Sequence, residues 1–173
     1  MRSIRSKMNI REALLAEHSK RRTLEIVDHI GEDPARFGEL MKIFFAGPYR
    51  VTQRAASPIN YCAERHPKLI RPFLKRLVAE LERADVHDAV RRNILRSLQF
   101  VEIPHSLKAR LYSLCLKFIA DRSQPVAVKV FATTVARKIA ESEPALMNEL
   151  RLVVRQQLPY ESIAFHKRAR GVV

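Results

Sequence analysis

The sequence is poor in the residues that interrupt helices or build specialised sites. Its 173 residues include four glycines, two cysteines and no tryptophan. Scarce glycine, together with the lack of any sustained alternation of polar and apolar residues, argues against strands and predicts a nearly all-helical chain. Glycine-rich phosphate loops are excluded as well. No stretch of about 18 apolar residues occurs, so the sequence does not predict a membrane span.

The two cysteines, Cys62 and Cys115, lie on predicted helices and are flanked by apolar residues. This setting favours buried free thiols over a disulfide and fits a reducing compartment. The first residues, MRSIRSKMN, are charged, and no apolar segment follows them as in a signal peptide. We therefore expect a cytoplasmic protein in which residues 1–8 form a flexible basic lead-in.

Catalytic and metal-binding patterns are missing too. The six histidines are dispersed, and no two have the i, i+4 spacing that places both imidazoles over one metal ion on a helix. The densest polar cluster, Asp85-Val86-His87-Asp88, is better explained as a helix start with Asp85 as the cap. The sequence predicts no enzyme, no cofactor, no metal site and no small-molecule substrate.

Amphipathic helices are what the sequence does contain, and residues 85–120 hold two of them. Each has an apolar stripe at helical spacing, and a break at Ile103-Pro104 separates the two. A single pair of helices cannot bury two such stripes, so this segment needs similar neighbours on both sides. That requirement is typical of a repeat array.

Further helices are predicted on both sides of residues 85–120. Residues 9–30 form either one long helix with an exposed turn or two helices that break near Ser19. A helix over 49–65 contains Pro58, which should kink or divide it. The remaining predicted helices cover 34–44, 69–81, 124–141 and 144–158.

Equivalent features recur with a period near that of a helical-pair repeat. Val51, Val90 and Val128 are 39 and 38 residues apart. The spacing of Asp85, Val90 and Arg91 resembles the HEAT-like repeat family, in which a turn Asp pairs with an Arg in the next helix. Interhelix prolines at matching turn positions add to this resemblance; they are Pro34, Pro67, Pro104 and Pro144.

The resemblance implies an all-α fold, a right-handed α-α superhelix of about four antiparallel helix pairs. We expect this short solenoid to occupy residues 9–158 and to be followed by a basic tail over 159–173. The family resemblance also implies a non-catalytic scaffold that binds a protein or peptide partner. In helical-repeat arrays the second helix of each pair usually lines the concave side, where partners bind.

Charge is the second guide to function, because the net charge is +14. Residues 1–22 and 151–173 together carry nine of these fourteen excess positive charges. When the second helices are aligned by their apolar stripes, Lys75, Tyr112 and Arg151 fall at equivalent positions, as do Arg71 and Lys108. These five residues are the predicted partner-binding site. The alternative explanation is that long basic side chains only solvate the exposed helix faces.

Nucleic acid is the alternative partner, bound weakly and without sequence preference through a basic surface. A DNA glycosylase family that removes alkylated purines is built from similar helical repeats with a basic concave face. Those enzymes stack the damaged nucleotide on aromatic residues, prominently tryptophan, and use a carboxylate in the groove. This chain lacks tryptophan and is shorter. No catalytic residue of that family is therefore assigned here.

Overall fold

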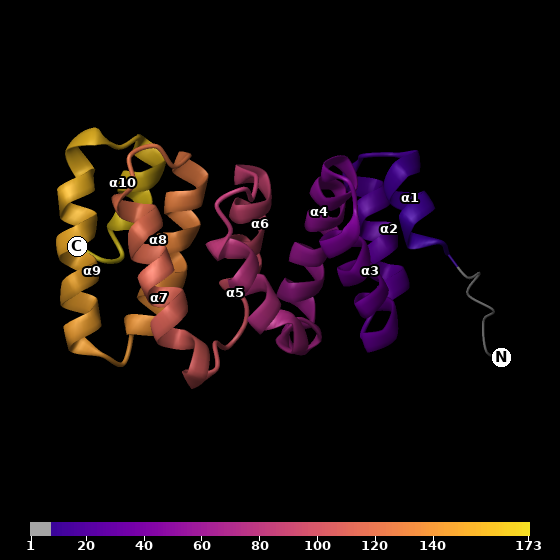
Figure 1. Ribbon diagram of the computed structural model, residues 1–173, viewed down its shortest axis with the longest axis horizontal. Helices are drawn as coiled ribbons and strands as arrows, with labels where there is room; N and C mark the ends of the chain where they lie inside the picture. Colours follow the sequence, from indigo (N-terminus) through magenta and orange to yellow (C-terminus); the bar gives the residue numbers. More distant parts are fainter. Residues whose placement is uncertain (1–7) are drawn as a thin grey trace. The chain divides into compact units, whose positions relative to one another are not determined.

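The computed structural model describes residues 8–173 (Figure 1), so the expected lead-in over residues 1–8 lies, apart from Met8, outside the described part. Ten α-helices and three short 3₁₀ turns make up this part of the chain, and no strand occurs within it. The all-helical class predicted from scarce glycine is confirmed. The chain divides into two compact units, the first ending at Pro72 and the second running from Phe73 to Val173.

The first unit is built around helix α4, Tyr49–Arg65. Helices α1 (Ile10–Ala16), α2 (Lys20–Ile30) and α3 (Pro34–Ala46) all pack against it. The core that they share is mainly apolar; it includes Ile10, Ile26, Ile30, Phe37, Leu40, Met41, Ala55 and Cys62. Pro58 lies inside α4 without dividing it, so the single-helix alternative holds for this segment.

Capping residues decide whether residues 9–30 form one helix or two. The segment 9–30 forms two helices, because the Ser19 side chain accepts a hydrogen bond from the Arg22 amide and starts α2. Asn9 caps α1 by accepting from the Glu12 amide at 3.1 Å, and its own amide group donates to the Glu12 carboxylate. Gly31 ends α2 with φ +53°, a conformation that favours glycine.

The segment 67–81 differs from the single helix that its apolar spacing predicts. Two 3₁₀ turns, η1 (Pro67–Leu69) and η2 (Arg71–Phe73), come first, and helix α5 begins only at Leu74 and ends at Glu82. Pro72 provides the physical reason, because proline has no amide hydrogen and its ring clashes with the preceding helical turn. Apolar periodicity identifies the buried positions of this segment but does not show that an α-helix begins only at Leu74.

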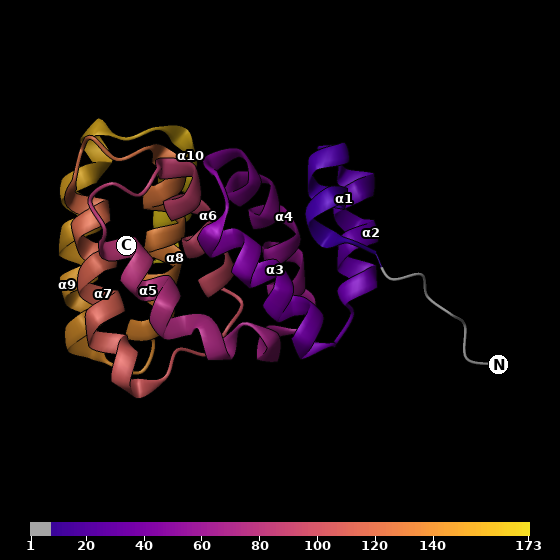
Figure 2. The same cartoon turned by 45° about the vertical axis from the view of Figure 1, so that its right-hand side comes forward.

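The second unit consists of two layers of helices. One layer contains α6 (Asp88–Leu98), α8 (Val126–Ala140) and α10 (Ile163–Ala169), and α8 packs against both of the others. The other contains α5, α7 (His105–Ala120) and α9 (Pro144–Gln157), with α7 packed against both neighbours (Figures 1 and 2). We call these the first-helix layer and the second-helix layer. Helices of the first-helix layer begin 38 and 37 residues apart, which matches the predicted repeat.

Residues 159–173 are folded into the second unit, which corrects the expectation of a basic tail. After the 3₁₀ turn η3 (Leu158–Tyr160), α10 packs on α8 and completes the first-helix layer. Phe165 is fully buried, and Ala169 and Val172 are also in the core. The sequence shows only a short apolar segment here, because three core residues are interspersed with a basic run.

The turn before α6 corrects a predicted ion pair. Asp85 pairs with Arg83, whose Nη2 lies 2.7 Å from a carboxylate oxygen. The Arg91 guanidinium instead donates to Asp88 at 3.0 Å. Helix α6 begins at Asp88 with His87 as its cap, so Asp85 lies outside the helix rather than capping it. The distance along the chain is right for the predicted pair, but the helix starts two residues later than expected.

Arg91 and Lys129 join successive repeats within the first-helix layer. Arg91 also donates to Gln124 at 3.3 Å, and Gln124 donates to the Asp121 carboxylate at 2.9 Å. Lys129, one repeat later, forms an ion pair with Glu161 in which both side chains are buried. In each case a cation that follows a core valine reaches the turn that precedes the next helix of its layer. These contacts are the local reason why the repeats stack in register.

Candidate functional site

The five predicted partner-binding residues are not one continuous row of free side chains. Arg71 lies on η2 in the first unit and is exposed. The other four belong to the second-helix layer of the second unit: Lys75 on α5, Lys108 and Tyr112 on α7, and Arg151 on α9. Lys75 is exposed and Lys108 is half-buried.

Tyr112 differs most from the expected surface position. Its side chain is buried, and its hydroxyl donates to the Leu146 carbonyl at 2.5 Å, which ties α7 to α9. Burial, reinforced by the nearby Glu149 carboxylate, raises the pKa of Tyr112 to about 12. Tyr112 is therefore a fixed, protonated part of the packing between α7 and α9.

Arg151 is exposed, but its guanidinium has partners within the second unit. Nε donates to the Val172 carbonyl at 2.9 Å, and Nη1 donates to the Asn148 side chain at 3.1 Å. These bonds hold the segment after α10 against α9. Of the four predicted residues in this unit, Lys75 and Lys108 are the ones whose charges face solvent without a role in the fold shown by the structure.

A groove of about 330 Å³ lies between α7 and α9. Lys108 and Tyr112 both line it, whereas Lys75 and Arg151 do not. The lining also includes carboxylates and apolar side chains; its nine residues are His105, Lys108, Ala109, Tyr112, Ser113, Ile139, Glu143, Leu146 and Glu149. The groove therefore offers positive charge, negative charge and apolar surface within one recess.

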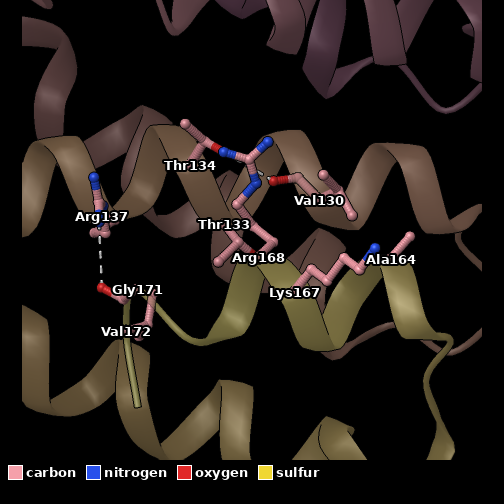
Figure 3. A pocket seen from close by; sticks show the side chains of 9 residues that line it. All are labelled: Val130, Thr133, Thr134, Arg137, Ala164, Lys167, Arg168, Gly171 and Val172. Atoms are coloured by element: carbon pink, nitrogen blue, oxygen red, sulfur yellow. Dashed lines mark hydrogen bonds between the residues drawn. The ribbon is translucent and has the colours of Figure 1, made fainter.

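A larger cleft, of about 500 Å³, lies between α8 and α10 in the first-helix layer (Figure 3). Three cations line it: Arg137 from α8, and Lys167 and Arg168 from α10. Its remaining lining residues are uncharged, namely Val130, Thr133, Thr134, Ala164, Gly171 and Val172. Arg137 donates weakly to the Gly171 carbonyl, at 3.4 Å. Among the residues that the structure describes, this cleft therefore has cations and no carboxylate in its lining.

The sequence predicted a basic tail over 159–173 and assigned no role to Arg137. Arg137 and the cations of that segment come together because α10 packs beside α8. A signal for this packing exists in the sequence: Phe165, Ala169 and Val172 have the i, i+4, i+7 spacing of a helix with one buried face.

Comparison with protein families identifies the chain. The model of the HEAT repeat domain matches residues 10–164, which cover most of the sequence. The chain belongs to the HEAT repeat family. The resemblance drawn from the turn residues and prolines is thereby confirmed, and so is the α-α superhelix class that it implied. The match extends past residue 158 into α10, in agreement with the folded position of that helix. A comparison with curated proteins found no match.

The two thiols of this HEAT repeat domain are packed in its cores. Cys62 lies in the first unit and Cys115 in the second, and both are free and fully buried. Burial raises the pKa of Cys62 to about 12 and raises that of Cys115 further. Since the thiolate is the reactive form, neither residue is poised as a nucleophile at neutral pH.

The described part of the HEAT repeat domain has neither a cluster of metal-binding side chains nor a membrane-spanning helix. Within residues 8–173, no three His, Cys, Asp or Glu side chains lie close enough together to hold a metal ion. Over the same range, every helix is too short or too polar to cross a lipid bilayer.

Proposed function

We propose that this HEAT repeat domain is a scaffold that binds a protein or peptide partner through its second helices. HEAT repeats form helical scaffolds that typically mediate protein interactions, and the second helices usually line the binding side of such arrays. The observation that carries the proposal is the mixed chemistry of the α7–α9 groove. Lys108, Glu149 and Leu146 line it together.

This combination suits a polypeptide better than a nucleic acid. A peptide can present a carboxylate to Lys108, a basic side chain to Glu149 or Glu143, and an apolar side chain to Leu146 and Ile139. A phosphate backbone has only negative charge to offer, so the two carboxylates would repel it. Binding would need no chemistry from the domain itself, as is usual for the family.

A steric block in the groove tests the proposal. Ala109 is exposed and lines the groove, so Ala109→Arg should fill it with a long side chain. Ala145 on α9 is also exposed and lies outside the lining, which makes Ala145→Arg a matched control. Peptides are first selected from a random display library on the wild-type chain, and their affinity is then measured for each variant.

We expect Ala109→Arg to abolish binding of the selected peptides and Ala145→Arg to leave it within about twofold of wild type. Charge reversal then tests how the peptide is oriented in the groove. Glu149→Lys should select against peptides with a basic residue at the position that faces residue 149. Selected peptides that bind Ala109→Arg as tightly as wild type would show that the partner surface lies elsewhere.

A further inference from the structure

The first-helix layer of the second unit is the more basic of the two layers. Helices α6, α8 and α10 together contain eight Lys or Arg residues and one acid, Asp88. Helices α5, α7 and α9 together contain seven Lys or Arg residues and three acidic residues. The excess positive charge therefore concentrates on the layer opposite to the one in which the sequence placed the predicted binding residues.

Four of the eight cations have partners in the fold, although the contact of Arg137 with the Gly171 carbonyl, at 3.4 Å, is weak. Arg91 pairs with Asp88, and Lys129 pairs with Glu161. Lys138 donates to the carbonyls of Gln99 and Val101, at the carboxyl end of α6. Apart from Lys138, five cations lack a carboxylate partner among the residues that the structure describes: Arg92 and Arg96 on α6, Arg137 on α8, and Lys167 and Arg168 on α10.

The cleft between α8 and α10 concentrates three of these five cations around one recess. Figure 3 shows Arg168 reaching from α10 toward the stretch of α8 that contains Val130 and Thr134. The hydroxyls of Thr133 and Thr134 donate to carbonyls of their own helix, at 2.8 and 3.1 Å. Attraction for a ligand in the cleft therefore comes from the guanidinium and ammonium groups, which select an anion.

The remaining two cations, Arg92 and Arg96, lie on the neighbouring helix α6 of the same layer. Helix α6 lies beside α8 and α8 beside α10. Neighbouring helix axes lie about 8–10 Å apart, so unpaired cations recur over roughly 20 Å across the layer. An isolated phosphate can occupy only the cleft, whereas a chain of phosphates can meet cations from all three helices. Duplex nucleic acid carries one charge per about 1.7 Å of its axis and is such a ligand.

We propose that the first-helix layer of the second unit binds the phosphate backbone of a nucleic acid, with the α8–α10 cleft as its main contact. The cleft lining contains valine, threonine, alanine and glycine and no aromatic residue for base stacking. Binding should therefore be independent of sequence. This surface differs from the α7–α9 groove, so the proposal stands or falls independently of the proposed protein partner.

The test measures binding of the full chain to a short fluorescent DNA duplex of random sequence, by anisotropy over a series of salt concentrations. Lys167→Gln with Arg168→Gln removes two cations from the cleft. Lys117→Gln with Arg155→Gln removes the same charges from exposed positions on α7 and α9 and serves as the matched control. Arg137→Gln and the pair Arg92→Gln with Arg96→Gln test the rest of the surface.

We expect the cleft variant to weaken binding about tenfold near physiological salt and to reduce the slope of log affinity against log salt by about two. Arg137→Gln should reduce the slope by about one, and the α6 pair should also weaken binding. The control should stay close to wild type. Circular dichroism melting of each variant verifies its fold.

A footprint supplies a readout that needs no variant. Duplex should protect Lys167 from acetylation in the wild-type chain while Lys117 stays reactive, as read by mass spectrometry.

Equal weakening by the cleft and control variants would overturn the proposal, because net charge alone would then explain binding. Loss of duplex binding on removal of residues 1–8 would also overturn the proposal. The same holds if binding is weakened only by substitutions at Arg71, Lys75, Lys108 and Arg151. Binding of a phosphopeptide or an anionic lipid vesicle, but not of duplex, would also contradict it.

Discussion

At the scale of single residues, Arg91 shows that a sequence match can give the right position and the wrong partner. Its place after Val90 predicted a bridge to Asp85, and the structure pairs it with Asp88 and Gln124. The guanidinium also lies 5.2 Å from the centre of the Phe118 ring. Arg91 is 8% exposed, so these contacts are largely shielded from water. Arg91 still joins two successive repeats, although its partners are Asp88 and Gln124 and not Asp85.

Arg91→Ala should therefore destabilise the protein by about 2 kcal/mol, since it removes charge-assisted hydrogen bonds and a cation–π contact. Arg92→Ala, one residue later on the more exposed side of α6, should cost less than about 0.5 kcal/mol. Urea unfolding followed by circular dichroism measures both. Asp85→Ala should have no effect on the Arg91 contribution in a double-mutant cycle. A coupling between Asp85 and Arg91 would restore the bridge predicted from the sequence.

Lys129 occupies the position that corresponds to Arg91 on the next helix of the layer. Both Lys129 and Glu161 are buried, and each is the ion-pair partner of the other. Lys129→Ala should cost about 3–5 kcal/mol, because it leaves a buried carboxylate without its counter-charge. Replacing both, Lys129→Met with Glu161→Leu, should recover most of that loss. Equal destabilisation by the single and double variants, in urea unfolding, would show that the pair is not the source of the cost.

At the scale of elements, apolar periodicity located most helices and proline explains the main exception. The stripes over 85–120 mark α6 and α7, because each buries one face against its neighbours. The segment 69–81 has an equally good stripe, yet Pro72 breaks its first turns into 3₁₀ conformation. Helix α10 was missed as part of the fold, since its packing on α8 depends on a contact distant in sequence. The cleft that it forms could not be predicted for the same reason.

The folded position of α10 gives a prediction at this scale. Phe165→Ala should destabilise the second unit by about 3–5 kcal/mol, because the side chain is fully buried and its removal leaves a cavity. Ile163→Ala, two residues earlier on the same helix, is the control, since Ile163 is 76% exposed. Thermal unfolding should show a clear drop for Phe165→Ala alone. Unchanged unfolding of the Phe165 variant would mean that residues 159–173 behave as the tail expected from the sequence.

At the scale of the whole molecule, our two proposals assign separate binding surfaces to the two helix layers of the second unit. The second-helix layer carries the mixed-charge α7–α9 groove, and the first-helix layer carries the cationic α8–α10 cleft. A scaffold gains from this separation, because two partners of different chemistry can be held at once. The sequence predicted a basic scaffold and placed its partner-binding residues on the second helices.

Simultaneous binding is the most direct test of this two-surface account. A fluorescent duplex is bound to the full chain, and a peptide selected on the α7–α9 groove is then added to saturation while duplex anisotropy is recorded. The account predicts that the duplex stays bound with unchanged affinity and that the peptide binds the duplex-loaded chain as tightly as the free chain. Displacement of the duplex by the peptide would contradict it, because both ligands would then compete for one surface.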